Sequence, residues 1–187
     1  MKSKIGIALS GGGARGIAHI GVLHALEENI IIPDVISGTS AVQLLGALYA
    51  AGKKPLEILA FVGKSKIYKT IRLGMPRSGL TDLSYLSQLL AENIAEDTFD
   101  SLSNPLFIAV SNLNSGELEI ISKGKLFDVV AASCSIPFVF KPVMMNDQYY
   151  IDGGLMNNLP SECLREKVEY LIGVNVMPRI KNENEGF

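Results

Sequence analysis

The chain has 187 residues, of which 48% are hydrophobic and 19% are charged, and its formal net charge is −2. This composition excludes an intrinsically disordered chain, and the lack of a basic excess excludes a general nucleic-acid binder. The length suits a single domain that can bury a real core. Two cysteines, Cys134 and Cys163, are too few for a disulfide framework and indicate a reducing, cytoplasmic environment.

The N-terminal third predicts alternating strands and helices. A short apolar run at 5–9 ends at glycines and is typical of a buried parallel strand. Apolar residues at helical spacing predict a helix over 15–29, and a second short strand is expected at 35–37. Two further helices are predicted, one that ends near residue 51 before a glycine and one over 55–62 that begins at a proline.

Residues 64–79 have only a weak pattern and contain two glycines and a proline, so we expect a mobile segment there. Their apolar side chains have lysine and arginine neighbours, which suits contact with an anionic lipid surface. A solvated loop with some side chains packed onto the core is the alternative.

The rest of the chain predicts more strands than helices. The expected elements are a helix from Thr81 to about 93, strands at 106–112 and 117–122, a helix at 125–133, a strand pair within 143–151, a helix at 160–167 and a strand at 170–176. This order predicts an α/β fold with a mainly parallel sheet, covered by helices on both faces, whose sites lie at the carboxyl ends of strands. No apolar run approaches the roughly 20 residues that a membrane span needs, so no transmembrane helix is expected.

The first candidate site is the glycine-rich loop from Gly11 to Gly16, between a predicted strand and a predicted helix. Backbone N–H groups and the helix dipole make such a loop a site for an anion. A dinucleotide-binding fold would have an acidic residue at the end of the second strand, but Gly38-Thr39-Ser40 stands there. We interpret the amides of Gly11, Gly12 and Gly13 as an oxyanion hole for acyl transfer, with a plain glycine turn as the alternative.

The second candidate is Ser40, at the next strand-to-helix junction. A sharp turn after Gly38 would expose its hydroxyl at a helix N-terminus, where developing negative charge is stabilised, so Ser40 is the candidate nucleophile. The nucleophile-elbow pattern G-x-S-x-G has a glycine where this chain has Val42. Taken alone, Ser40 fits a helix N-cap equally well.

The third candidate is Asp152, which is followed by Gly153 and Gly154. The two glycines leave the carboxylate accessible and let the backbone turn, although an ordinary turn is the alternative. The chain's only histidines, His19 and His24, both lie on the first predicted helix, whereas a triad would need one on a late loop. Asp152 is therefore the candidate base, which requires burial and a direct hydrogen bond to the serine hydroxyl.

Together these segments resemble the patatin-like phospholipase family. The resemblance rests on SGGGARG at 10–16, GTSA at 38–41, ASCSIP at 132–137 and DGGLMNNLP at 152–160, and it spans nearly the whole chain. It implies a three-layer α/β/α sandwich and a calcium-independent lipid acyl hydrolase that needs no metal or organic cofactor. It also implies that Ser40 is the nucleophile and Asp152 the base of a dyad, and that Arg15 steadies the loop or contacts the lipid head group.

Two departures from the family pattern, Val42 in the elbow and Phe138 after Pro137, are expected to narrow the space near the nucleophile. Such domains usually continue through further helices, so we expect residues 1–187 to be one patatin-like domain that is incomplete at its C-terminal end. We interpret the chain as a serine hydrolase of lipid esters, of phospholipase A, lysophospholipase or esterase type, in peripheral contact with membranes. The alternative is a catalytically impaired lipid-binding member of the family.

Overall fold

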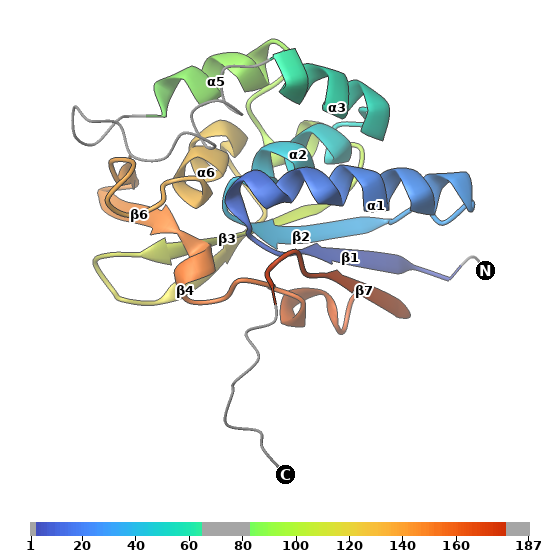
Figure 1. Cartoon of the computed structure of the whole chain (residues 1–187). Helices are drawn as coiled ribbons and strands as arrows, with labels where there is room; N and C mark the ends of the chain where they lie inside the picture. Colours follow the sequence, from blue (N-terminus) through green and yellow to red (C-terminus); the bar gives the residue numbers. More distant parts are fainter. Residues whose placement is uncertain (1–2, 65–82, 179–187) are drawn as a thin grey trace.

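A seven-stranded sheet forms the centre of the part of the chain that the computed structural model describes, residues 3–64 and 83–178 (Figure 1). Its strands are β1 (Ile5–Leu9), β2 (Val35–Thr39), β3 (Leu106–Asn112), β4 (Leu118–Ile121), β5 (Val143–Met145), β6 (Gln148–Asp152) and β7 (Tyr170–Val174). The α-helices of these residues are α1 (Ile17–Glu28), α2 (Val42–Ala50), α3 (Pro55–Lys64), α5 (Ser84–Ala91) and α6 (Leu126–Ser133). Short 3₁₀ helices are η1 (Gly13–Gly16), η2 (Phe99–Ser101), η3 (Gly153–Leu155) and η4 (Glu162–Leu164).

The sheet combines a parallel half with an antiparallel half. β7, β1, β2 and β3 are parallel to their neighbours, whereas β4 and β6 are antiparallel to β3, and β5 is antiparallel to β6. β2 pairs with β3 as far as Ala109, and β6 pairs with β3 from Val110 onward. Because β4 occupies the other edge of β3 across both stretches, β2 and β6 lie end to end along one edge of β3.

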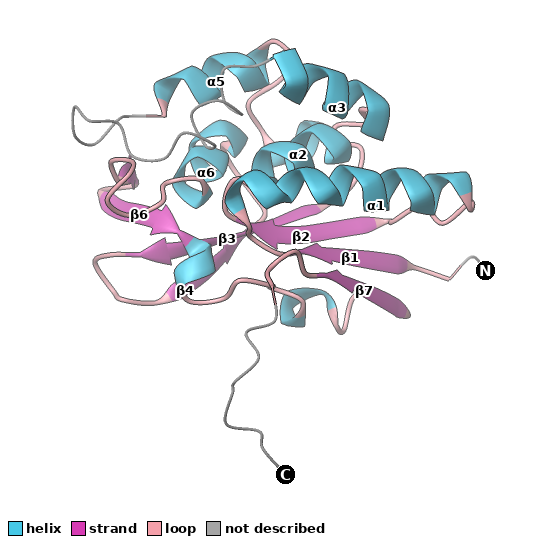
Figure 2. Ribbon diagram, in the orientation of Figure 1, coloured by secondary structure: helices cyan, strands magenta, loops and turns pink. Residues whose placement is uncertain are grey.

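The α-helices lie together on one face of the sheet, as the cyan ribbons above the magenta strands show (Figure 2). The main core fills the space between them, and its largest fully buried side chains come from the strands and from facing helices: Ile7, Leu9, Ile36, Ile108, Leu23, Leu48, Leu90 and Leu126. A thinner layer covers the opposite face, where the Ser37 hydroxyl donates to the Pro160 carbonyl (2.7 Å). The α/β class with a central sheet is therefore confirmed.

Most predicted elements are confirmed to within a few residues, but the predicted helix at 160–167 is wrong. Only η4 forms there, because the chain turns in successive i+3 steps: the Leu164 amide donates to Ser161 and the Lys167 amide donates to Leu164. The expectations for Thr81 and for most of the segment 64–79 fall outside the described residues. Among the helices that the structure describes, none is long and apolar enough to cross a bilayer.

Candidate active site

Ser40 and Asp152 meet where β2 and β6 end beside β3. Ser40 follows the last residue of β2, and Asp152 is the last residue of β6. The two strands approach this junction from opposite directions, so their carboxyl ends face each other. As a result the Ser40 hydroxyl donates a 2.6 Å hydrogen bond to Oδ2 of Asp152. Both side chains are buried, each with 6% of its surface exposed.

The backbone of Ser40 is held in an uncommon conformation. Its φ of 66° lies in the left-handed region, which residues other than glycine rarely adopt. The Ser40 amide donates to the Ser133 hydroxyl (3.0 Å), and the Ser40 carbonyl accepts the Gln43 amide (2.9 Å) at the start of α2. A sharp, strained strand-to-helix turn of this kind is the geometry of a nucleophile elbow.

The side chain, the amide and the carbonyl of Asp152 all form hydrogen bonds. Its Oδ1 accepts the Gly154 amide (2.8 Å), its own amide donates to the Ser135 carbonyl (3.1 Å), and its carbonyl accepts the Ser111 hydroxyl (3.1 Å). Burial raises the pKa of Asp152 above its ordinary value, and the hydrogen bonds from Ser40 and Gly154 partly oppose that rise. A raised pKa makes this carboxylate a better proton acceptor than an exposed aspartate.

Two of the predicted glycines allow close approach of backbone segments at this junction. A Cβ at Gly153 would lie 2.4 Å from the carbonyl carbon and oxygen of Ala109 in β3. A Cβ at Gly38 would lie 2.8 Å from the Leu9 carbonyl oxygen. Any side chain at Gly153 would therefore push Asp152 away from Ser40.

The glycine loop lies against Ser40, but its amides are not equivalent. A Cβ at Gly11 would lie 3.0 Å from the Ser40 Cβ, which places the loop beside the hydroxyl. The Gly11 amide donates to the Asn158 carbonyl (3.0 Å), and its role in an oxyanion hole stays a prediction. The amides of Gly12 and Gly13 have no acceptor among the described residues, which leaves these two N–H groups to bind an anion.

The two departures from the family pattern, Val42 and Phe138, have different surroundings. Val42 is 1% exposed and packs over Gly16, where an added Cβ would lie 2.7 Å from the Val42 Cγ2. Phe138 is 84% exposed, so its ring does not fill the space around the hydroxyl. The expectation that Phe138 narrows the site is therefore corrected, whereas the expectation for Val42 stays a prediction. Arg15 is exposed, and its amide closes the loop onto the Gly12 carbonyl (3.0 Å).

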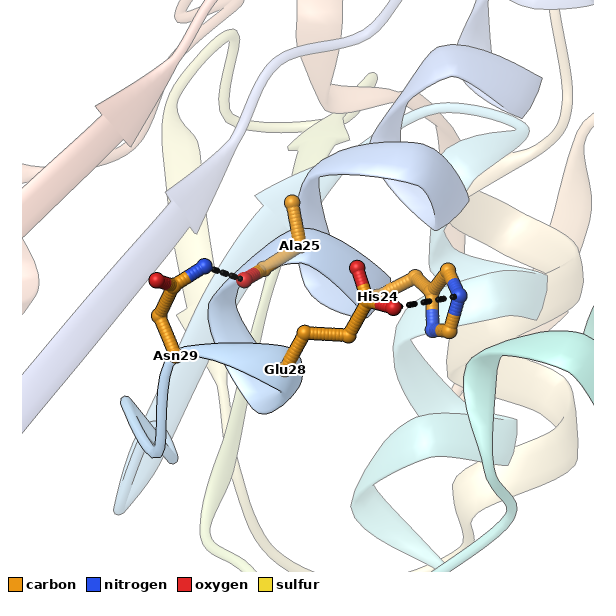
Figure 3. A network of polar contacts seen from close by, with 4 residues as sticks. All are labelled: His24, Ala25, Glu28 and Asn29. Carbon is orange, nitrogen blue, oxygen red and sulfur yellow. Dashed lines mark hydrogen bonds and ion pairs between the residues drawn. The ribbon is translucent and has the colours of Figure 1, made fainter.

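Neither histidine reaches the Ser40 hydroxyl. His19 is fully buried, and its Nε2 lies 2.9 Å from the Ser10 carbonyl, which holds the strand end just before the glycine loop. Burial lowers the pKa of His19, and the contact with Ser10 partly opposes this. His24 turns toward Glu28 one helical turn later (3.7 Å), at the far end of α1 (Figure 3).

A small apolar cavity of about 20 Å³ lies directly behind Ser40. That volume holds about one water molecule. Two of its lining residues touch the nucleophile's turn: Ala41 is its chain neighbour, and the Cys134 thiol lies 3.6 Å from the Ser40 carbonyl oxygen. The remaining lining residues come from α2, from α5 with Leu83 before it, and from the chain after α6: Leu44, Leu83, Tyr85, Leu86, Ile136 and Phe140. Both cysteines are free thiols, and the described residues contain no cluster of side chains suited to a metal ion.

Two residues at this junction had no predicted role. Ser133 binds the Ser40 amide, and Asn158 joins the glycine loop to the turn after Asp152 through its carbonyl and its Nδ2, which lies 3.4 Å from the Gly11 carbonyl. Both stand inside quoted motifs, ASCSIP and DGGLMNNLP. The motifs therefore indicated that these segments belong to the site, but only the three-dimensional contacts show what Ser133 and Asn158 do there.

The chain is similar in sequence to several known proteins. Residues 7–163 match a family described as patatin-like phospholipase. The chain is 32% identical over 173 residues to "Lysophospholipase NTE1" of Cryptococcus neoformans var. neoformans serotype D, and the match covers 87% of this chain and 10% of the fungal protein. An uncharacterized NTE family protein of Mycobacterium tuberculosis is 31% identical over 163 residues, covering 86% of this chain and 28% of its own.

The fold also has a counterpart among solved structures. VipD from Legionella pneumophila superposes with a TM-score of 0.62 over 99% of this chain and 48% of that one, at 16% sequence identity. At this identity the likeness concerns the fold alone. The chain thus spans a tenth to a half of the lengths of these three proteins.

Proposed function

Because the chain belongs to the patatin-like phospholipase family, a family of lipid hydrolases, we propose that it cleaves lipid esters with Ser40 as nucleophile and Asp152 as base. One observation carries this proposal: the buried 2.6 Å hydrogen bond between the Ser40 hydroxyl and Oδ2 of Asp152, next to two unoccupied loop amides. A dyad of this kind needs no histidine, because the raised pKa of the aspartate supplies the basicity.

The reaction follows in two halves. The Ser40 Oγ attacks the ester carbonyl carbon while its proton passes to Asp152. The resulting oxyanion accepts hydrogen bonds from the backbone N–H groups of Gly12 and Gly13. The carbon–oxygen bond to the alcohol then breaks, Asp152 returns the proton to the leaving alcohol, and an acyl-enzyme remains on Ser40. Water, deprotonated by Asp152, then attacks the acyl carbonyl carbon, the bond from that carbon to the Ser40 Oγ breaks, and Asp152 returns the proton to the serine oxygen as the fatty acid leaves. Each oxyanion donor in such a site contributes about 10²–10³-fold in rate.

The apolar cavity behind Ser40 supports a substrate with a hydrocarbon chain. Its lining begins at Ala41 and Cys134, next to the reacting hydroxyl, and continues between α2 and α5. At about 20 Å³ it is too small for an acyl chain, so entry of a chain would require its lining side chains to move apart. The curated relative named lysophospholipase favours a single-chain phospholipid as the substrate to test first.

Release of free fatty acid from a lysophospholipid and from a neutral monoacylglycerol tests this proposal, with and without a calcium chelator. We expect hydrolysis that the chelator does not reduce, and loss of all but a few per cent of it in Ser40→Ala. Higher residual activity in Ser40→Ala would exclude Ser40 as nucleophile. Activity that requires calcium would exclude a mechanism based on Ser40 and Asp152 alone.

A further inference from the structure

The turn at the end of α6 contacts both members of the Ser40–Asp152 pair through three consecutive residues. The Ser133 hydroxyl accepts the Ser40 amide (3.0 Å), and the Cys134 thiol donates to the Ser40 carbonyl (3.6 Å). The Ser135 carbonyl accepts the Asp152 amide (3.1 Å). This turn therefore holds two residues that lie 112 positions apart in the sequence.

Of the three contacts, the one made by Ser133 bridges β2 and β3 at the point where their backbone hydrogen bonds end. The β2–β3 ladder ends at the pair Thr39 and Ala109, because Ser40 turns away with positive φ. Beyond that pair the Ser133 hydroxyl stands between the strands: it accepts the Ser40 amide and donates to the Ala109 carbonyl (2.8 Å). Ser133 is fully buried, so water cannot take its place without opening the site.

The same carbonyl fixes the other half of the pair. Gly153 follows Asp152 and lies against the Ala109 carbonyl, where an added Cβ would be 2.4 Å from its oxygen. Rotation of this peptide would displace Gly153, and with it Asp152. The Ser133 hydroxyl thus orients one peptide group that both Ser40 and Asp152 depend on.

We propose that Ser133 is a positioning residue, which sets the direction of the Ser40 hydroxyl toward Asp152 by bridging the Ser40 amide and the Ala109 carbonyl. This inference rests on the proposed function of Ser40 as nucleophile. A displacement of about 1 Å in a reacting group costs on the order of 10²-fold in rate. Loss of the bridge should therefore slow the chemical step while substrate binding stays unchanged.

The chain offers a matched control two residues away. The Ser135 hydroxyl is equally buried, but it donates only to Ala131 one turn earlier in α6 (2.9 Å). Ser133→Ala and Ser135→Ala remove the same atom from the same turn, so their effects on packing are comparable. Ser135 contacts Asp152 through its backbone carbonyl, which alanine keeps, so only Ser133→Ala removes a contact with the Ser40–Asp152 pair.

The test measures the rate at which a fluorophosphonate labels Ser40, together with kcat and KM on a short-chain ester. In Ser133→Ala we expect labelling and kcat to fall by about 10- to 100-fold with KM within twofold. Ser135→Ala should stay within twofold of the unmodified chain. Labelling of Ser133→Ala at the unmodified rate, or an equal loss in Ser135→Ala, would overturn the proposal. If Ser133→Ala does not fold, Ser133→Cys takes its place, because a thiol of similar size is a weak donor and acceptor.

A second measurement does not depend on activity. Amide hydrogen exchange at Ser40 should accelerate at least tenfold in Ser133→Ala and remain unchanged in Ser135→Ala. An unlabelled but folded unmodified chain would contradict the proposed function, whereas unchanged exchange at Ser40 in Ser133→Ala would contradict the bridge itself. The two failures are therefore distinguishable.

Discussion

At the scale of single residues, burial of Asp152 makes it a stronger base and also lowers the stability of the fold. The buried carboxylate accepts hydrogen bonds from the Ser40 hydroxyl and from the Gly154 amide, yet burial raises its pKa. The folded protein therefore holds this proton more tightly than the unfolded chain does. Stability is lost as the pH rises from the ordinary aspartate pKa through the raised one, and the full cost is present above the raised pKa.

Asp152→Asn should accordingly separate activity from stability. We expect esterase activity to fall by roughly 10³-fold or more, because the base is gone. We also expect Tm at pH 7 to rise by a few degrees, because a neutral amide replaces a desolvated charge. Calorimetry of Asp152→Asn measures this change. The control is Asp100→Asn, at an exposed aspartate, which should leave Tm unchanged. A lower Tm for Asp152→Asn would show that the charge stabilises the fold.

The residue His19 gives the chain a pH dependence of the opposite kind. Its folded pKa is lowered by burial, so the unfolded chain takes up the proton first as the pH falls below about 6.5. Stability is present above this value and is lost on acidification. His24, which is only partly buried at the far end of α1, is the matched control.

Urea unfolding between pH 7.5 and 5.5 measures this slope. We expect the free energy of unfolding to fall with pH by up to about 1.4 kcal/mol per unit. His19→Gln should flatten the slope, because an amide does not titrate and its NH₂ group can reach the Ser10 carbonyl. His24→Gln should keep it. A slope that survives in His19→Gln would assign the pH dependence to other groups.

At the scale of elements, the start of α2 fits the start of α1 through Val42 and Gly16. The branched side chain occupies the space that a side chain at Gly16 would need. Val42 therefore belongs to the contact between the two helix starts.

A double-mutant cycle tests this packing. Gly16→Ala should cost about 1–3 kcal/mol by overpacking, and Val42→Ala a comparable amount by leaving a void. The double variant should be more stable than the sum of the two losses predicts, by at least about 1 kcal/mol. Additive losses would show that the two side chains do not share one space.

The helix α5 offers a test of the acyl-chain path. Leu86 and Leu90 are both buried on this helix, but only Leu86 lines the cavity behind Ser40. Each leucine-to-alanine change should cost about 2–5 kcal/mol in stability. Only Leu86→Ala should raise the ratio of kcat/KM for an eight-carbon ester over a four-carbon ester, by about tenfold. An equal shift in Leu90→Ala would mean that loosening of α5, and not the cavity, sets chain length.

At the scale of the whole molecule, local patterns predicted the elements, and long-range pairing decided the site. The apolar run at 5–9 is typical of a strand, and the turn residues at 114–116 and 146–147 are typical of hairpins. The positions of these elements were therefore predictable. Nothing local indicates that β2 and β6 end head to head on one edge of β3, because register is set by the sheet as a whole.

The same distinction explains which contacts at the site the sequence does not predict. The glycine loop was predicted from its composition, but the Gly11 amide is taken by Asn158, which lies 147 residues later. Ser133 lies at the end of a predicted helix, and only the folded structure brings its hydroxyl to the Ser40 amide at the end of β2. Contacts at such separations are tertiary, and no local pattern carries them.

Covalent labelling shows whether Ser40 is the nucleophile. The folded chain, treated with a fluorophosphonate and digested, should carry the adduct on the peptide that contains Ser40. Ser40→Ala should carry none, and Asp152→Asn should label at least 10²-fold more slowly. An adduct on any other residue, or no adduct on a chain that calorimetry shows to be folded, would contradict the account.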